Sequence, residues 1–112
     1  MIVQDILDEV RSKLDDVAKA RWDDSELIAH VNDCENFITI NRPETLLRSN
    51  GTMVTRPAVS NLSDTLTLTD KFKMAFVAYV LSKALSKYAS NRQDTVRARD
   101  ELVAFKIELG IG

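Results

Sequence analysis

The segment FKMAFVAYVLSKALSKY, residues 72–88, is apolar on most of its sides when it is drawn as a helix. It contains the longest uninterrupted apolar run of the chain, Met74–Leu81. A helix that is apolar almost all round is normally buried by its neighbours. We therefore expect a central helix over about residues 70–89, with Thr69 or Asp70 as its N-cap.

Two helices are predicted before the central one. Apolar residues at steps of three and four predict a helix over residues 3–18. A second helix over residues 23–41 has Asp23 as its N-cap candidate, with Glu26 at the reciprocal position of a capping box. Pro43 ends this helix, because the residue before a proline is pushed out of the helical region of backbone space.

The last helix is predicted over residues 92–109, after a break at Ser90 and Asn91. Its inner face has apolar residues at helical spacing, namely Ala98, Leu102, Phe105 and Leu109. Gly110 follows at the position where a C′ glycine commonly ends a helix. Three glycines and two prolines disfavour a β-sandwich with many turns. The expected fold class is mainly α, a four-helix bundle-like single domain over residues 1–112, in which Phe76, Val80, Leu102 and Phe105 join the two closing helices.

Residues 44–68 form an insert between the second and third helices. Asn50 and Gly51 are the two-residue signal of a type I′ hairpin turn, and TLTLT at residues 65–69 alternates like a half-exposed strand. Pro57 limits the strand after the turn. We expect a short β-hairpin or an extended insert, which is marginal until it packs on helices or on a neighbouring subunit. The insert should therefore become ordered on assembly.

Acidic and basic residues are distributed unevenly along the chain. Residues 1–42 have a net charge of −5, residues 43–69 of zero and residues 70–112 of +3, and the whole chain has −2. One interpretation is that acidic helices pack against basic ones within a subunit, with the charges on solvated faces. The other is a head-to-tail ring contact between the acidic flank of one subunit and the basic flank of its neighbour.

Residues able to support catalysis or metal binding are few. His30 and Cys34 lie one helical turn apart with Glu26 a further turn away, but the chain has no second His or Cys. Zinc sites need three or four committed ligands, and a Cys–His pair needs a third group to orient the base. Three scattered glycines cannot form a phosphate-binding loop. We expect no enzyme activity, no cofactor and no metal site.

The expected compartment is a reducing cytoplasm. A single cysteine cannot close an intramolecular disulfide, and the first ten residues are acidic where a secretory signal would be basic. No apolar run approaches the roughly 18 residues of a membrane span. We expect no interaction with a membrane.

Two blocks of the chain carry a wider resemblance: RWDDSELIAHVNDCENFITINRP at residues 21–43, and AYVLSKALSKYASN at residues 78–91 followed by AFKIELG at residues 104–110. They resemble the head-to-tail adaptor (connector) proteins of tailed bacteriophages. The matching elements occur in the same order, as Asp5-Ile6-Leu7, Arg21-Trp22, Asp23-Asp24, Glu26-Leu27, Asn32-Asp33 and Arg42-Pro43. The insert at residues 44–68 differs from the family pattern, because members of the family carry a longer, β-rich insert at this place.

The resemblance implies a structural virion protein in the neck of the particle, at the head-tail interface, that is assembled in the host cytoplasm. Its partners would be copies of itself in a dodecameric ring, the portal protein, and the tail or a stopper or terminator protein. DNA would pass through the lumen during ejection without sequence-specific binding, which a net acidic channel favours by avoiding phosphate contacts.

The candidate structural or subunit-contact residues are Arg21, Trp22, Asn32, Arg42, Pro43, Asn50, Gly51, Arg97 and Arg99. Trp22 can pack over the junction of the first two helices, and Arg21 or Arg42 can tie helix ends together or bind a neighbour.

A small helical DNA-binding or regulatory protein is the alternative. A dedicated nucleic-acid binder is normally basic overall, whereas this chain has a net charge of −2. Its C-terminal part, residues 70–112, is nevertheless basic. The phosphate-contacting face would consist of Lys83, Lys87, Arg92, Arg97 and Arg99. Salt-dependent duplex binding would favour this alternative, whereas binding to a portal ring without DNA affinity would favour the adaptor.

Overall fold

A computed structural model of the protein describes residues 1–15, 21–87 and 92–110. Its helices are α1 (Val3–Leu14), α2 (Asp24–Asn41), α3 (Lys73–Lys87) and α4 (Arg92–Leu109), with the short 3₁₀ turns η1 (Pro43–Leu46) and η2 (Asp70–Phe72). The prediction of a mainly α fold with four helices is confirmed. The predicted β-hairpin is wrong, because the described residues contain isolated β-bridges and no strand.

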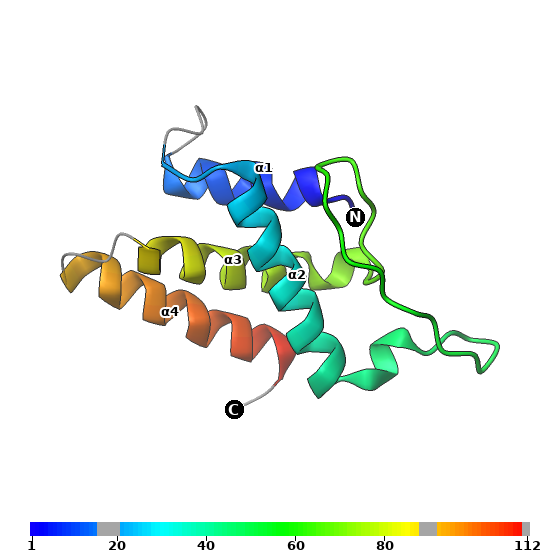
Figure 1. Ribbon diagram of the computed structural model, residues 1–112. Helices are drawn as coiled ribbons and strands as arrows, with labels where there is room; N and C mark the ends of the chain where they lie inside the picture. Colours follow the sequence, from blue (N-terminus) through cyan, green and yellow to red (C-terminus); the bar gives the residue numbers. More distant parts are fainter. Residues whose placement is uncertain (16–20, 88–91, 111–112) are drawn as a thin grey trace.

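α3 is the central helix, as its apolar sequence predicts. It lies between α1 and α4 in one layer, and α2 crosses this layer on one face (Figure 1). Nine of its residues are buried, and Phe76 and Val80 are completely so. Phe105 of α4 is 1% exposed, with its ring centroid 5.0 Å from that of Tyr79. Leu102 is partly buried against the same core.

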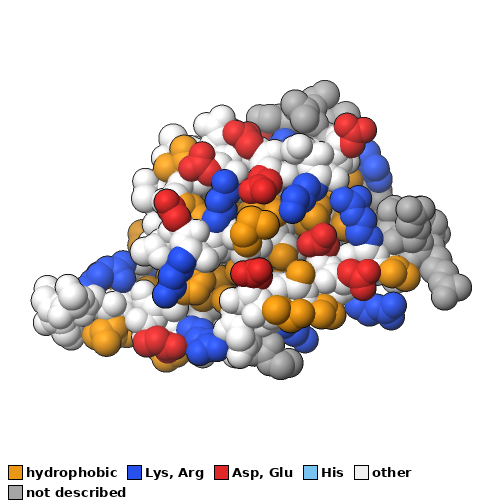
Figure 2. Space-filling model, turned by 180° about the vertical axis from the view of Figure 1, so that it is seen from behind, with side chains coloured by type: hydrophobic (Ala, Val, Ile, Leu, Met, Phe, Trp, Pro, Cys, Tyr) orange, Lys and Arg blue, Asp and Glu red, His pale blue; other side chains and the backbone are white. Residues whose placement is uncertain are grey.

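The layer makes the molecule flat. Its principal extents are 48, 32 and 16 Å. On the face that α2 does not cover, apolar side chains form small patches separated by charged ones (Figure 2). The described residues of that face therefore form no broad apolar surface.

Some of the observed helix boundaries agree with those predicted from the sequence. Asp23 is the N-cap of α2, and its Oδ1 accepts from the Glu26 N–H at 2.8 Å. α2 ends at Asn41 before Pro43, and Gly110 follows α4 with a φ of +70°. The predicted break at Ser90 and Asn91 lies outside the described residues.

Two predicted boundaries are wrong. α1 ends at Leu14 because Asp15 adopts the left-handed conformation, with a φ of +56°, and its N–H reaches carbonyls of the last turn. The expected continuation to residue 18 falls partly outside the described chain. Thr69 precedes η2 without a side-chain cap, and α3 begins only at Lys73.

The first half of the insert projects from the helices as an arm, which we define as residues 43–55 (Figure 1). Its tip is a tight turn in which the Arg48 N–H donates to the Thr52 oxygen at 2.8 Å and the Gly51 N–H to the Arg48 oxygen at 2.9 Å. Gly51 has a φ of +85°, but Asn50 does not have a positive φ. The predicted type I′ turn is therefore wrong. The pattern is that of a three-residue loop closed by a left-handed glycine.

The second half of the insert returns along the helices. TLTLT has the predicted alternation, with Leu66 and Leu68 buried and Thr65 and Thr69 exposed. It is not a strand, however, because it pairs with the start of the chain only through one isolated antiparallel bridge, between Ile2 and Thr65. Beside this bridge the Leu66 N–H donates to the Met1 oxygen at 3.0 Å. Just before it, the Asp64 and Leu62 oxygens accept from N–H groups at the start of α1. These carbonyls satisfy donors that a helix N-terminus leaves unpaired.

Candidate functional site

Trp22 lies buried at the junction of α1, α2 and α3. Its Nε1 donates to the Ala84 oxygen at 2.9 Å, and its own oxygen accepts from Arg11 Nη1 at 2.8 Å. Arg11 is itself buried and forms an ion pair with Asp24 at 2.8 Å. The Arg21 guanidinium lies 4.6 Å from the centroid of the Trp22 ring on the exposed side. Trp22 is thus a core residue that Arg21 covers.

A polar row on α2 holds the returning half of the insert. Asn32 Nδ2 donates to the Val59 oxygen at 2.8 Å, and the Val59 N–H donates back to Asn32 Oδ1 at 2.9 Å. One turn later, Glu35 is completely buried, and its Oε1 lies 3.3 Å from Arg56 Nη1. Glu35 Oε2 also accepts from the Leu68 N–H at 3.5 Å. Asn32, one of the sequence candidates, therefore has a structural role within the subunit.

Arg42 ties the ends of two helices together. Its Nη2 donates to the Leu109 oxygen at 2.6 Å and to the Gly110 oxygen at 3.3 Å. Its Nη1 lies 3.8 Å from Glu44 Oε1. Carbonyls at a helix C-terminus attract a cation. Arg42 thus fixes the C-terminal end of α4 beside the end of α2, while Pro43 is exposed at the start of the arm.

Arg97 and Arg99 differ in their surroundings. Arg97 Nη2 donates to the Lys13 oxygen at 2.8 Å, which links α4 to the last turn of α1. Arg99 is exposed and makes no hydrogen bond or ion pair with a described residue. It lines a shallow hollow of about 240 Å³ between α3 and α4, together with Lys83 and Thr95.

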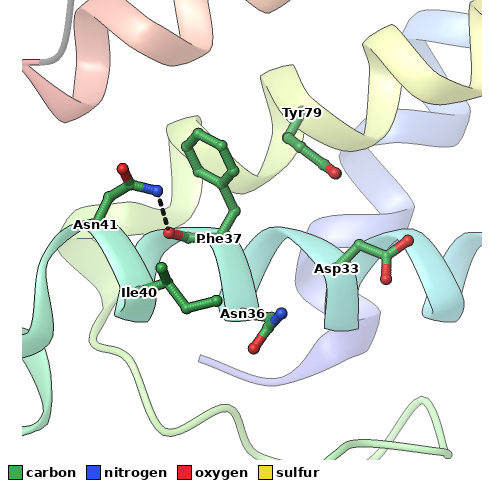
Figure 3. Close-up of a pocket in the computed structure, with 6 residues that line it drawn as sticks. All are labelled: Asp33, Asn36, Phe37, Ile40, Asn41 and Tyr79. Atoms are coloured by element: carbon green, nitrogen blue, oxygen red, sulfur yellow. Dashed lines mark hydrogen bonds between the residues drawn. The ribbon is translucent and has the colours of Figure 1, made fainter.

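A second hollow, of about 300 Å³, lies on α2 beside α3 (Figure 3). Phe37 points toward α3, and Tyr79 approaches from that helix, whereas Asp33, Asn36 and Ile40 lie along the outer side of α2 (Figure 3). Burial raises the pKa of Tyr79, and the nearby Asp33 carboxylate adds to this. The hollow combines the aromatic rings of Phe37 and Tyr79 with the polar side chains of Asp33 and Asn36.

The largest of these hollows is the groove between the arm and the start of α3, with a volume of about 510 Å³. We call it the arm groove. Arg42, Arg48 and Lys71 line it together with one carboxylate, Glu44. Leu47 contributes apolar surface. The sequence candidates Asn50 and Gly51 lie at the tip of the arm, beyond the groove, and both are exposed.

His30 and Cys34 have the environments of structural residues. Burial lowers the pKa of His30 and raises the pKa of the fully buried Cys34 thiol well above its ordinary value. A buried neutral thiol is a poor nucleophile. In the described part of the chain, no group of three or more His, Cys, Asp or Glu residues is placed to hold a metal ion.

Two charged residues of the core were missed by the sequence analysis. Arg11 and Glu35 are buried, yet neither was singled out. Their burial could have been predicted from the sequence, because each lies on the apolar face of its helix. Arg11 follows Leu7 by four residues, and Glu35 precedes Ile38 by three.

None of the described helices is both long and apolar enough to cross a membrane. Comparison of the chain with protein-family models, curated proteins and solved structures gave no match.

Proposed function

We propose that the protein is a structural adaptor subunit of a tailed bacteriophage, present as repeated copies in a ring between the portal and the tail. The observation that carries this proposal is the arm. It projects from a flat subunit, and none of its residues is buried. Two of its apolar side chains face solvent, with Leu47 49% and Met53 57% exposed. An isolated turn of this kind is marginal by itself, so contact with another subunit would stabilise it.

The sequence resemblance supports the same role. The pattern from Arg21-Trp22 to Arg42-Pro43 follows that of the adaptor family. Within the subunit these residues hold helix ends and the core together, as the bonds of Trp22 and Arg42 illustrate. Such internal bonds suit a rigid building block, on which the arm is the contact element. The ring would be dodecameric and would act as a DNA conduit during ejection.

The charge of the protein favours a role as a DNA conduit over a role as a tight DNA-binding protein. The chain has a net charge of −2. Several cations of the basic C-terminal part already have partners inside the subunit, since Lys87 Nζ lies 2.7 Å from Glu26 Oε1 and Arg97 bonds the Lys13 oxygen. Fewer cations are then available for phosphates, whose contacts would slow a sliding duplex.

Binding to a reconstituted portal ring tests the proposal. The variant L47S/M53S removes the exposed apolar side chains of the arm and should fold normally but fail to load onto the portal. M74S is the matched control, because Met74 is 46% exposed and belongs to α3, outside the arm. Equal loading of L47S/M53S, M74S and the parent would exclude the arm as an assembly element.

One observation favours the alternative of a small DNA-binding protein. Arg99 has no partner among the described residues and lines the same hollow as Lys83, so two cations lie where a phosphate would bind. Under this alternative, the isolated protein binds duplex DNA, and R99A lowers the salt slope of binding by about one phosphate contact. Absence of duplex binding at low salt would eliminate it.

A further inference from the structure

An acidic stripe runs along one face of α1. It consists of Asp5 and Asp8, which are three residues apart and therefore lie on one side of the helix. Both side chains are exposed, and neither forms an ion pair with a described residue. Glu9 differs from them, because its Oε2 lies 3.5 Å from Lys73 Nζ. The stripe thus carries charge that the subunit leaves uncompensated.

The arm groove carries uncompensated charge of the opposite sign. Arg48 donates from Nη1 to the Thr45 oxygen at 3.2 Å and from Nη2 to the Thr67 oxygen at 3.4 Å, and both acceptors are neutral. Lys71 Nζ lies 5.1 Å from the centroid of the Phe72 ring. Neither cation forms an ion pair with a residue in the described ranges. Glu44 is the groove's acidic group and lies beside Arg42 instead.

The two surfaces do not meet within one subunit. α1 lies along one edge of the helical layer, whereas the arm leaves from the end of α2 and points away from the layer (Figure 1). No residue of α1 lines the arm groove. Two complementary charged surfaces at different places on one molecule are the requirement for a heterologous contact, which repeats from copy to copy.

We infer that the acidic stripe of α1 docks into the arm groove of the next copy of the chain. Asp5 and Asp8 pair with Arg48 and Lys71 of the neighbour, and the half-exposed Leu47 adds apolar contact. Such charge complementarity fixes partner orientation and accelerates encounter. The inference rests on the proposed function, because it names the contact that joins the repeated subunits.

Charge reversal followed by charge exchange tests the contact. D5K/D8K and R48E/K71E should each weaken self-association about tenfold at low salt, measured by sedimentation over a range of protein concentrations. The quadruple variant D5K/D8K/R48E/K71E should recover the parental affinity, because the charges of the two surfaces are exchanged and not lost. K106E/R99E is a matched control that reverses two cations on the outer side of α4 and should associate like the parent.

Cross-linking tests the geometry. Ser12 lies on the same face as the stripe, and Ser49 lines the arm groove; both are exposed. The variant S12C/S49C should form a ladder of covalent oligomers with a short bifunctional maleimide, whereas S12C or S49C alone should form none through this contact. The native Cys34 is fully buried and does not interfere. A ladder that stops at the dimer would overturn a head-to-tail arrangement.

The outcomes separate this inference from the proposed function. If the parent assembles, alone or on a portal ring, and both reversal variants assemble with unchanged affinity, the contact lies elsewhere and only the inference fails. If the parent stays monomeric at every concentration and on the portal, the proposed function fails, and the inference fails with it.

Discussion

Arg56 reaches from the insert to Glu35, a completely buried carboxylate of α2, with 3.3 Å between Nη1 and Oε1. The Arg56 side chain is 19% exposed, so this ion pair lies at the boundary between the core and solvent. Arg56 Nη2 also donates to Asn36 Oδ1 at 3.4 Å. The contact divides the insert in two, since the arm projects before it and a segment fixed to α2 follows it.

Removal of Arg56 should therefore destabilise the fold. R56M leaves the Glu35 carboxylate buried without its cation, and we expect a loss of about 3 kcal/mol in the free energy of unfolding. The double variant E35Q/R56M should lose less than R56M alone, because no unpaired charge remains and the amide oxygen can still accept from the Leu68 N–H. Chemical denaturation measures both. A double variant less stable than R56M would mean that Glu35 tolerates the loss of its partner.

Phe105 should be a major contributor to stability. It is 1% exposed between Phe37 and Tyr79, with ring centroids at 5.4 and 5.0 Å. F105A should lower the free energy of unfolding by about 3 to 5 kcal/mol, because it leaves a cavity in the core. V103A is the matched control on the same helix, where Val103 is 50% exposed, and should change stability by less than about 0.5 kcal/mol. Similar values for the two variants would contradict the assigned packing of α4.

Amide exchange should distinguish the two halves of the insert. Amides of the arm should exchange quickly in the isolated subunit, since the arm has no buried residue. The amides of Val59 and Leu66 should exchange slowly, because they donate to Asn32 Oδ1 and to the Met1 oxygen. From the sequence, all of residues 44–68 were expected to become ordered on assembly. The structure limits this expectation to the arm. Assembly should slow exchange in the arm; strong protection of the arm in the monomer would contradict its role as a contact element.

His30 should titrate below its ordinary range. Burial disfavours the charged imidazolium and lowers the pKa of His30 from 6.5, although Asp33 and Glu26 oppose this shift. The unfolded chain therefore takes up the proton at a higher pH than the native protein, so this group's contribution to stability is present above pH 6.5 and is lost as the pH falls through the native pKa. The single histidine makes its ring proton signals simple to follow by NMR. A native pKa at or above 6.5 would contradict the buried environment.

The helical part of the fold could be predicted because its signals are local. Asp23 caps α2, and Pro43 and Gly110 lie at helix ends, as the sequence indicates. The alternating burial of Leu66 and Leu68 was equally visible in the pattern. Its interpretation as a strand was wrong, since it pairs with the start of the chain, which is remote in sequence, only through an isolated bridge between Ile2 and Thr65. Backbone pairing of that kind depends on tertiary structure.

The roles of the candidate residues could be predicted only in part. That Trp22 packs at a helix junction followed from its position before a cap, whereas its bond to Ala84, 62 residues away, did not. Asn50 illustrates a different limit. Its Oδ1 accepts from the Thr52 N–H at 3.1 Å, and this local bond favours a longer loop over the two-residue turn that Asn-Gly usually forms.

The most direct test of the central claim is the number of copies of this chain bound to one portal ring, determined by native mass spectrometry of the reconstituted complex. The proposed function predicts a closed ring of identical subunits, expected to be dodecameric, that loses copies when the arm is altered in L47S/M53S. One or two copies per portal, or no binding by the parent protein, would contradict it.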